Sequence, residues 1–337
     1  MTPGANFERA KRIRAWTILI LTNILSLACM VWVLNGAGIQ HIWGEVRHMR
    51  WNWVSLAIVS DACVYLLHGW RWKLLLQPVM RVPYLQSVEA IYVGLFTNEV
   101  LPFRAGELIR CFLLAKSARL PLSVSFASAL IERIFDGVWL MICFLFAVHM
   151  GRMPGLLRKG GYILGILIVI AAIVLGYAMY AKKQSLGPIF GLTWPRWFDT
   201  LIEDLHLIGH SRYLYFSFLV SGCYLLAQIL PIYALVQANR LPVPWTASFV
   251  LMVLLRLSSI VPQAPGNLGS FQVVTARTLV VFGLAMGHAK RFSLILWAVV
   301  TIPLIVIGFI AVAMEGINLT HLHREAASAA QKRDERR

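Results

Sequence analysis

Residues 98–107 read Asn-Glu-Val-Leu-Pro-Phe-Arg-Ala-Gly-Glu, and residues 258–267 read Ser-Ser-Ile-Val-Pro-Gln-Ala-Pro-Gly-Asn. Both follow one pattern: two aliphatic residues, Pro, two variable residues, a small residue, Gly and a polar residue, offset by 160 (262 − 102). Pro and Gly interrupt helices. Paired interruptions in the two halves of a membrane protein mark the binding site of many transporters. Two such loops also arise by chance in a long apolar chain, so the flanking sequence has to decide.

The composition excludes a soluble domain. Hydrophobic residues make up 59% of the chain and charged residues 14%, and the mean hydropathy is +0.70. Several apolar runs approach the ~20 residues that a spanning helix needs; they cover residues 15–34, 54–70, 134–150, 161–181, 213–238 and 292–314. We therefore expect an all-α polytopic membrane protein with about six to eight spans, folded as one integral membrane domain over residues 1–337.

The charge of the chain points to lipid. The net charge is +16, which in a soluble protein would favour nucleic acid. Here the basic residues stand at span ends and in short loops, so anionic headgroups are the better partner, and no nucleic acid is expected. The cysteines and histidines show no metal-ligand spacing, and the sequence predicts no cofactor.

Basic clusters also predict the topology. The basic residues before the first span and in the 315–337 tail place both termini in the cytoplasm, in a bacterial inner membrane. Basic residues flank 88–101 on both sides, so this stretch is expected to enter and leave on the same side. The loops at 152–159 and 288–291 violate the positive-inside rule mildly.

The 160-residue offset maps three apolar segments of the first half onto segments of the second. We therefore predict two repeats, 15–150 and 161–314, of inverted topology. Each contains one re-entrant hairpin, at 88–101 and at 249–261, and the two hairpins should approach each other near the midplane.

Three stretches resemble one family: Gly94-Leu-Phe-Thr-Asn-Glu-Val-Leu-Pro-Phe-Arg-Ala-Gly-Glu-Leu-Ile-Arg110, Ile131-Glu-Arg-Ile-Phe-Asp-Gly137, and Val261-Pro-Gln-Ala-Pro-Gly-Asn-Leu-Gly-Ser-Phe-Gln272. They are similar to the transmembrane, flippase-like region of lysylphosphatidylglycerol synthases, which also occurs as standalone proteins. The chain departs from the family pattern at Asn267, where Gly is usual, and at Gln272, where Glu is usual. Loss of that carboxylate puts a proton- or cation-linked role of position 272 in doubt.

The resemblance implies a lipid translocase for an anionic or isoprenoid-linked lipid. It does not imply an enzyme, because the soluble aminoacyl-transfer domain is missing. The expected lipid-binding residues are Asn98, Arg104, Glu107, Arg110, Glu132, Arg133, Asp136, Pro262, Pro265, Gly266, Gly269 and Gln272. Two alternatives stay open: an accessory protein of a lipid-modifying or hopanoid or polyprenyl-glycolipid pathway, and an intramembrane transferase acting on a lipid headgroup.

The ionisable residues allow two interpretations. Arg104, Arg110 and Arg133 can pair with three carboxylates as a purely structural cluster, or one arginine, Arg104, can be left to bind a lipid phosphate. Arg71 and Lys73 stand where interface anchors usually stand, and we expect them to reach the headgroup region.

Overall fold

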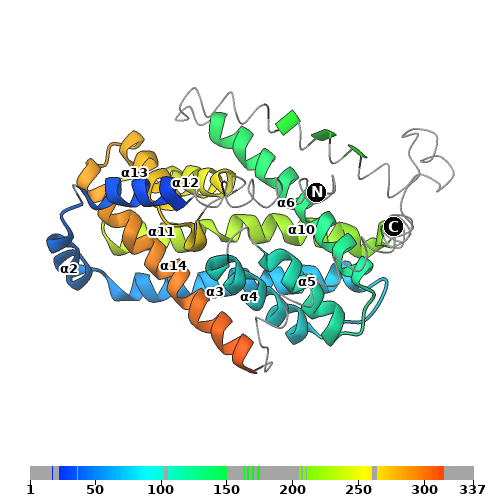
Figure 1. Cartoon of the computed structure of the whole chain (residues 1–337). Coiled ribbons are helices and arrows are strands. Elements are labelled where there is room, and N and C mark those ends of the chain that lie inside the picture. The colour runs from blue at the N-terminus through cyan, green and yellow to red at the C-terminus, as the bar shows by residue number, and fades with distance from the viewer. Residues whose placement is uncertain are drawn as a thin grey trace, which may run out of the picture. The chain divides into compact units, whose positions relative to one another are not determined.

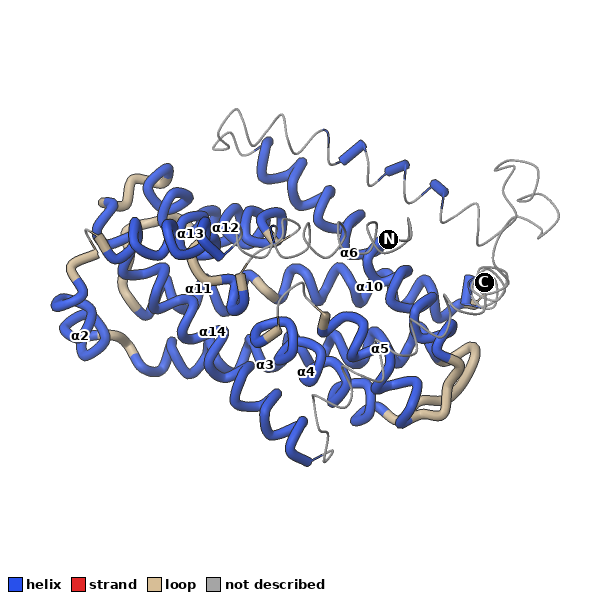
Figure 2. The backbone as a smooth tube through the Cα atoms, viewed as in Figure 1, coloured by secondary structure: helices blue, strands red, loops and turns tan. Residues whose placement is uncertain are grey.

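The computed structural model describes residues 17, 23–35, 37–101, 105–149, 163, 165–166, 169–170, 173–174, 205, 208–209, 211–259 and 264–314. Within these ranges all regular structure is helical (Figure 2). The predicted span 161–181 falls mainly outside the described residues, as do the predicted cytoplasmic segments before residue 17 and after residue 314. The described part confirms an all-α membrane protein.

Figure 1 shows the helices of the described part, coloured in chain order. A short helix, Asn23–Leu34, comes first. The labelled helices are α2 (Ile39–His48), α3 (Trp51–Leu76), α4 (Tyr84–Val100), α5 (Gly106–Ser117), α6 (Leu122–His149), α10 (Arg212–Ala227), α11 (Ile229–Ala238), α12 (Trp245–Ser258), the 3-10 turn η2 (Pro265–Asn267), α13 (Ser270–Val281) and α14 (Met286–Met314).

Length and hydropathy separate spanning helices from broken ones. Three helical stretches among the described residues are long and apolar enough to cross a membrane: α3, the continuous α10–α11 stretch and α14. The 28-residue α6 has the length too, but it carries three Asp, Glu or Arg residues. By contrast, α4 and α5 have 17 and 12 residues, and α12 and α13 have 14 and 12. These are shorter than the ~20 residues of a span.

The same order of helices therefore occurs twice along the chain: a long helix, a short helix, an interruption, a second short helix and a second long helix. The first set starts with α3 at Trp51 and ends with α6, and the second starts with α10 at Arg212 and ends with α14. These starts fall close to the offset seen in the sequence. That the two sets have opposite orientation stays a prediction.

Both interruptions lie between helices that pack on each other. A Cβ added to Gly94 of α4 would lie 3.0 Å from the carbonyl oxygen of Gly106 and 2.7 Å from the Cβ of Arg110, both on α5. Only a glycine allows the two helices to approach so closely. The helices α12 and α13 also contact one another. The predicted hairpin stretches 88–101 and 249–261 thus supply only one arm each, α4 and α12, because each is a single helix up to Val100 and Ser258. We therefore call α4–α5 the first hairpin and α12–α13 the second hairpin.

The chain divides into two compact units. Unit 1 consists of Met1–Ile58, Thr97–Ala105 and Pro231–Ile305, and unit 2 consists of Val59–Phe96, Gly106–Leu230 and Val306–Arg337. Unit 1 thus contains the second hairpin and the end of α4, whereas unit 2 contains most of the first hairpin.

In unit 2, glycines allow helices to pack closely, while many large apolar side chains face outward. A Cβ on Gly69 would meet Val88 at 2.5 Å, and one on Gly308 would meet Phe96 at 2.5 Å, so these glycines allow helices to touch. Many large apolar side chains face outward instead: Phe146 is 50% exposed and Leu219 58%. An outer surface of this kind suits hydrocarbon rather than water.

Candidate functional site

The ionisable side chains of unit 2 form a closed ring of alternating charge. Arg71 Nε lies 3.1 Å from Glu132 Oε1, and Arg110 Nη1 lies 2.9 Å from Glu132 Oε2. Arg110 Nη2 lies 3.0 Å from Glu107 Oε2, and Arg133 Nη2 lies 2.8 Å from Glu107 Oε1. Arg133 Nη1 lies 3.9 Å from Asp136 Oδ2, and Asp136 pairs with Arg71 to close the ring. Three guanidinium groups thus neutralise three carboxylates. We call these six residues the ion ring.

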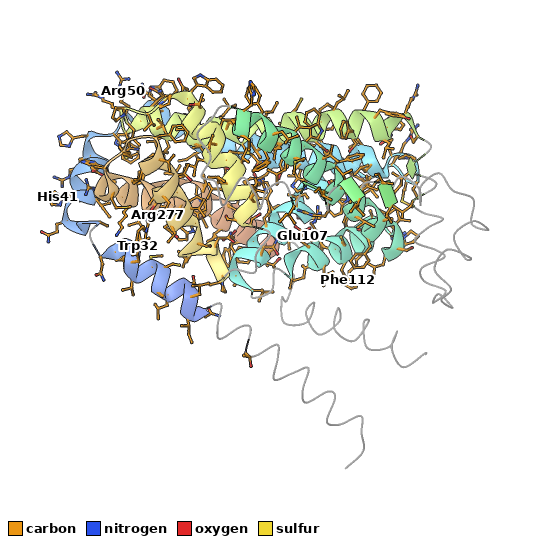
Figure 3. All side chains as sticks on the ribbon, turned by 90° about the horizontal axis from the view of Figure 1, so that it is seen from above. Trp32, His41, Arg50, Glu107, Phe112 and Arg277 are labelled. Atoms are coloured by element: carbon orange, nitrogen blue, oxygen red, sulfur yellow. The ribbon has the colours of Figure 1, made fainter. Side chains whose placement is uncertain are left out.

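Three helices supply the ion ring, and on α5 and α6 the spacing of the charged residues places them on one side of the helix. Glu132 and Asp136 are four residues apart on α6, and Glu107 and Arg110 are three apart on α5, so each pair lies on one side of its helix. Figure 3 locates Glu107 on α5 together with Phe112. The helix α3 contributes Arg71.

Burial varies strongly around the ion ring. The side chains of Arg71 and Glu132 have no exposed surface and that of Arg110 is 3% exposed, whereas those of Glu107 and Arg133 are 37% and 48% exposed. Charges buried this deeply are tolerated only when each has a partner. The ion ring therefore has a dry inner side and an open outer side.

Aromatic and polar neighbours enclose the dry side. The guanidinium of Arg71 lies 4.8 Å from the ring centroid of Tyr224, and that of Arg110 lies 4.6 Å from the centroid of Trp72. Both distances allow a cation–π interaction. The Trp72 indole donates to Ser128 Oγ at 2.8 Å, which fixes the platform beneath Arg110.

The expectation for Arg71 was wrong. The sequence suggested an interface anchor, but Arg71 is fully buried and holds two carboxylates of α6. The reason is that α3 continues to Leu76, so Arg71 lies inside the helix rather than at its end, on the side that faces α6. Arg71 therefore fills the place that the sequence had left for Arg104 as the third arginine. Arg104 and Pro262 lie outside the described residues.

The break of the second hairpin, residues 265–269, contains two glycines, and three side chains donate hydrogen bonds to its backbone. Gly266 and Gly269 have φ values of 73° and 87°, in the region that side chains other than glycine rarely adopt. The Trp297 indole donates to the carbonyl of Gly266 at 2.8 Å, and Ser270 Oγ donates to the carbonyl of Asn267 at 3.3 Å. Ser26 Oγ donates to the carbonyl of Leu268. The carbonyl groups of Gly266, Asn267 and Leu268 therefore each accept a hydrogen bond from a side chain.

Gln272 places hydrogen-bond donors at the start of α13. Its Oε1 accepts from the backbone N–H of Gly269 at 2.7 Å, which holds the carboxamide against the first turn of the helix. Its Nε2, on the same carboxamide, has no hydrogen-bond partner among the described residues, although Gln272 is fully buried. The first N–H groups of a helix also lack intrahelical partners. The start of α13 therefore combines amide donors with the positive end of the helix dipole.

The ends of the two hairpins meet within unit 1. Asn267 Nδ2 donates to Glu99 Oε1 at 3.1 Å. Asn98 precedes Glu99, and its buried Oδ1 has no partner among the described residues. Glu99 was not among the residues predicted from the sequence, because nothing in the local sequence identifies the partner of an acid beside a break. Asn267, one of the departures from the family pattern, supplies the contact.

The structure therefore sorts the predicted lipid-binding residues into two groups. The ion ring of unit 2 contains Glu107, Arg110, Glu132, Arg133 and Asp136. Unit 1 contains the hairpin residues Asn98, Pro265, Gly266, Gly269 and Gln272.

Comparison with known proteins places the chain in a family. The family described as the lysylphosphatidylglycerol synthase TM region matches residues 17–308. A UPF0104 membrane protein of Methanothermobacter thermautotrophicus is 27% identical over 297 residues, which cover 82% of this chain and 86% of the relative. A UPF0104 membrane protein of Methanocaldococcus jannaschii is 22% identical over 143 residues, covering 42% of this chain and 41% of the relative. The match of the family to most of the chain agrees with the helical architecture, and the chain belongs to the lysylphosphatidylglycerol synthase transmembrane-region family.

Proposed function

We propose that this protein is a lipid translocase, which moves an anionic or isoprenoid-linked lipid across the bacterial inner membrane. The observation that carries the proposal is the meeting of two broken hairpins, joined at their ends by Asn267 and Glu99. Irregular backbone at membrane depth is tolerated where it is buried in protein or lines a water-filled path. Broken helices in corresponding positions of two halves are the usual substrate region of transporters.

The charge balance of the ion ring supports a separate role for Arg104. The carboxylates of Glu107, Glu132 and Asp136 are all neutralised by arginines other than Arg104. The positive charge of Arg104 is therefore not needed to balance them. A guanidinium can meet two phosphate oxygens at once, so we assign Arg104 to the lipid phosphate at the first hairpin.

The second hairpin is suited to the same chemistry from its own side. Gln272 Nε2, which has no partner among the described residues, and the first N–H groups of α13 are donors, and both favour an anion or another acceptor. A carboxylate at position 272 would repel an anion, whereas the carboxamide does not. The replacement of Glu by Gln in this chain is thus consistent with phosphate recognition at the second hairpin.

The proposal gives the chain no catalytic step. An acid or base that acts on a substrate needs a free protonation site, whereas Glu132 and Asp136 are each held by two basic residues. The ion ring is better suited to fixing the first hairpin to α6 and α3. We therefore assign it a positioning role and keep the transferase only as an alternative that an enzyme assay would reveal.

Transport in liposomes tests the proposal directly. Purified protein is reconstituted with a fluorescent anionic phospholipid or a labelled polyprenyl phosphate, and the labelled lipid that reaches the other leaflet is measured against empty liposomes. We expect faster exchange with the protein. If no candidate lipid moves faster than in empty liposomes, and a deletion strain keeps its leaflet composition, the accessory role replaces the translocase.

Variants at Arg104 locate the phosphate contact. Arg104→Gln should abolish exchange while the protein still accumulates in the membrane, and Arg104→Lys should rescue poorly because an ammonium offers no planar fork. The matched control is Lys116→Gln, which removes an exposed positive charge from α5. Full activity of Arg104→Lys would show that charge alone suffices, and loss of protein in both Arg104 variants would favour a structural role for Arg104.

A further inference from the structure

A second basic cluster lies in unit 1 and consists of Arg277 and Lys290. The guanidinium carbon of Arg277 lies 4.9 Å from the ring centroid of Trp32, and the ammonium of Lys290 lies 4.0 Å from the same ring. Figure 3 shows Trp32 beside Arg277, at the end of the unit that also carries His41 and Arg50. Two positive charges on one indole repel each other, because they are closer than the ~10 Å over which 0.1 M salt screens charge.

Lys290 has a structural role within this cluster. It is 6% exposed, and its Nζ donates to the backbone carbonyls of Trp32 and Asn35 at 2.6 and 2.7 Å. These carbonyls end the helix Asn23–Leu34, so Lys290 caps that helix at the negative end of its dipole. With two carbonyls and the indole around it, the ammonium has little capacity left for a ligand.

Arg277 is different, because it is exposed and its charge is not matched. Its guanidinium stacks on the Trp32 ring, and among the described residues no carboxylate lies within ion-pair distance of Arg277 or of Lys290. The neighbouring Arg291 is neutralised in contrast, since its Nε lies 2.7 Å from Glu45 Oε1. The guanidinium of Arg277 therefore keeps N–H donors for a ligand that is negatively charged.

The surroundings favour a lipid as the source of that charge. Trp32 stands near the end of a helix with an exposed apolar side, since Leu25 and Leu27 are each 65% exposed and Val31 is 48% exposed. An apolar outer face that ends in an indole and basic side chains is typical of the boundary between hydrocarbon and headgroups. The segments 35–50 and 270–291 hold five Lys or Arg residues and one acidic residue. In the predicted topology they lie on the non-cytoplasmic side, where the positive-inside rule disfavours such an excess.

We propose that Arg277, held beside Trp32 and Lys290, binds the phosphate of an anionic lipid headgroup. An anion at Arg277 relieves the repulsion between the two cations, and the indole contributes an apolar wall for the glycerol end of the lipid. This inference rests on the proposed translocase, for which it supplies a headgroup site on the side of the second hairpin.

Lipid binding by the purified full-length protein tests the site. The protein in detergent is titrated with phosphatidylglycerol or with phosphatidylcholine, and retained lipid is counted by native mass spectrometry. We expect tighter retention of phosphatidylglycerol, and we expect Arg277→Gln to weaken it about tenfold, the effect of losing one charge-assisted hydrogen bond. The matched control is Arg212→Gln, because Arg212 is also exposed and lies 5.6 Å from the ring of Tyr213.

The outcomes separate this site from the transport hypothesis. Equal retention of phosphatidylglycerol by Arg277→Gln and by the unmodified protein would overturn the site, and so would an equal loss in Arg212→Gln. Inorganic phosphate is tested as a competitor. If it displaces phosphatidylglycerol and raises the melting temperature only when Arg277 is present, the ligand of the site is a soluble anion and not a lipid. If the protein binds lipid through Arg277 but moves no lipid in liposomes, the translocase is refuted and the proposed headgroup site stands.

Discussion

Removing Arg71 should destabilise the protein more than removing any other single charge on α3. Arg71 has no exposed surface, and it contacts Glu132 at 3.1 Å, both oxygens of Asp136, and Ser221 Oγ at 3.4 Å. Arg71→Met keeps much of the volume but leaves Asp136 with only Arg133, whose Nη1 lies 3.9 Å from Asp136 Oδ2. Breaking a buried ion pair on one side costs about 3–5 kcal/mol, which is a factor of a hundred or more in the folding equilibrium.

A second substitution should recover part of that loss. Arg71→Met leaves the ion ring with two arginines and three carboxylates, and the further change Asp136→Asn restores the balance. The double variant should therefore lose less stability than the two single variants added together, by about 0.5–3 kcal/mol. The single change Lys73→Met is the control, because it removes a nearby positive charge of α3 that takes no part in the ion ring.

The free energy of unfolding can be followed by titrating the purified protein in mixed micelles with a denaturing detergent. We expect Lys73→Met to stay within about 0.5 kcal/mol of the unmodified protein. A cost for Arg71→Met below about 1 kcal/mol, or strict additivity in the double variant, would refute the argument that the ion ring is a coupled and dry network.

Two further predictions concern the hairpins. Gly269→Ala should lower accumulation and the melting temperature, because the added Cβ would clash with the backbone oxygen of Ser26. Gly266→Ala should cost only the strain of the left-handed backbone, about 1–2 kcal/mol, since the nearest atom to its Cβ, in the Leu268 side chain, would be 3.4 Å away. Equal melting temperatures of the two variants would contradict this packing. Leu85→Cys and Lys116→Cys, at the exposed start and end of the first hairpin, should both react with a membrane-impermeant thiol reagent from the cytoplasmic face. Labelling from opposite faces would refute the re-entrant hairpin.

Gly266 and Gly269 differ in their surroundings, although both have positive φ. Only Gly269 also lies against the backbone of another helix, the one that contains Ser26. A transport defect in Gly269→Val would therefore be confounded by misfolding, whereas Gly266→Ala is the cleaner probe of the break itself.

Much of the architecture could be predicted because it depends on local sequence. Apolar length predicts spans, so α3, α10–α11 and α14 follow from hydropathy alone. Pro and Gly end helices whatever surrounds them, and the chain does leave helix near Pro102 and around Pro265–Gly269. The shared spacing on α6 also indicated that Glu132 and Asp136 would face one way.

The partners of these charges depended on tertiary structure. Arg71 and Arg104 look alike in the sequence, and nothing local says which of them reaches the carboxylates of α6. That choice is made by the rotation and depth of α3 as it packs on α6, which buries Arg71 between Glu132 and Asp136. The contact of Asn267 with Glu99 likewise joins residues 168 positions apart. The sequence alone determined the helices and their interruptions, because hydrophobic length and backbone conformation act within a few residues. Only the packed structure decided which charges neutralise one another, because an ion pair depends on distances between helices that no local pattern encodes.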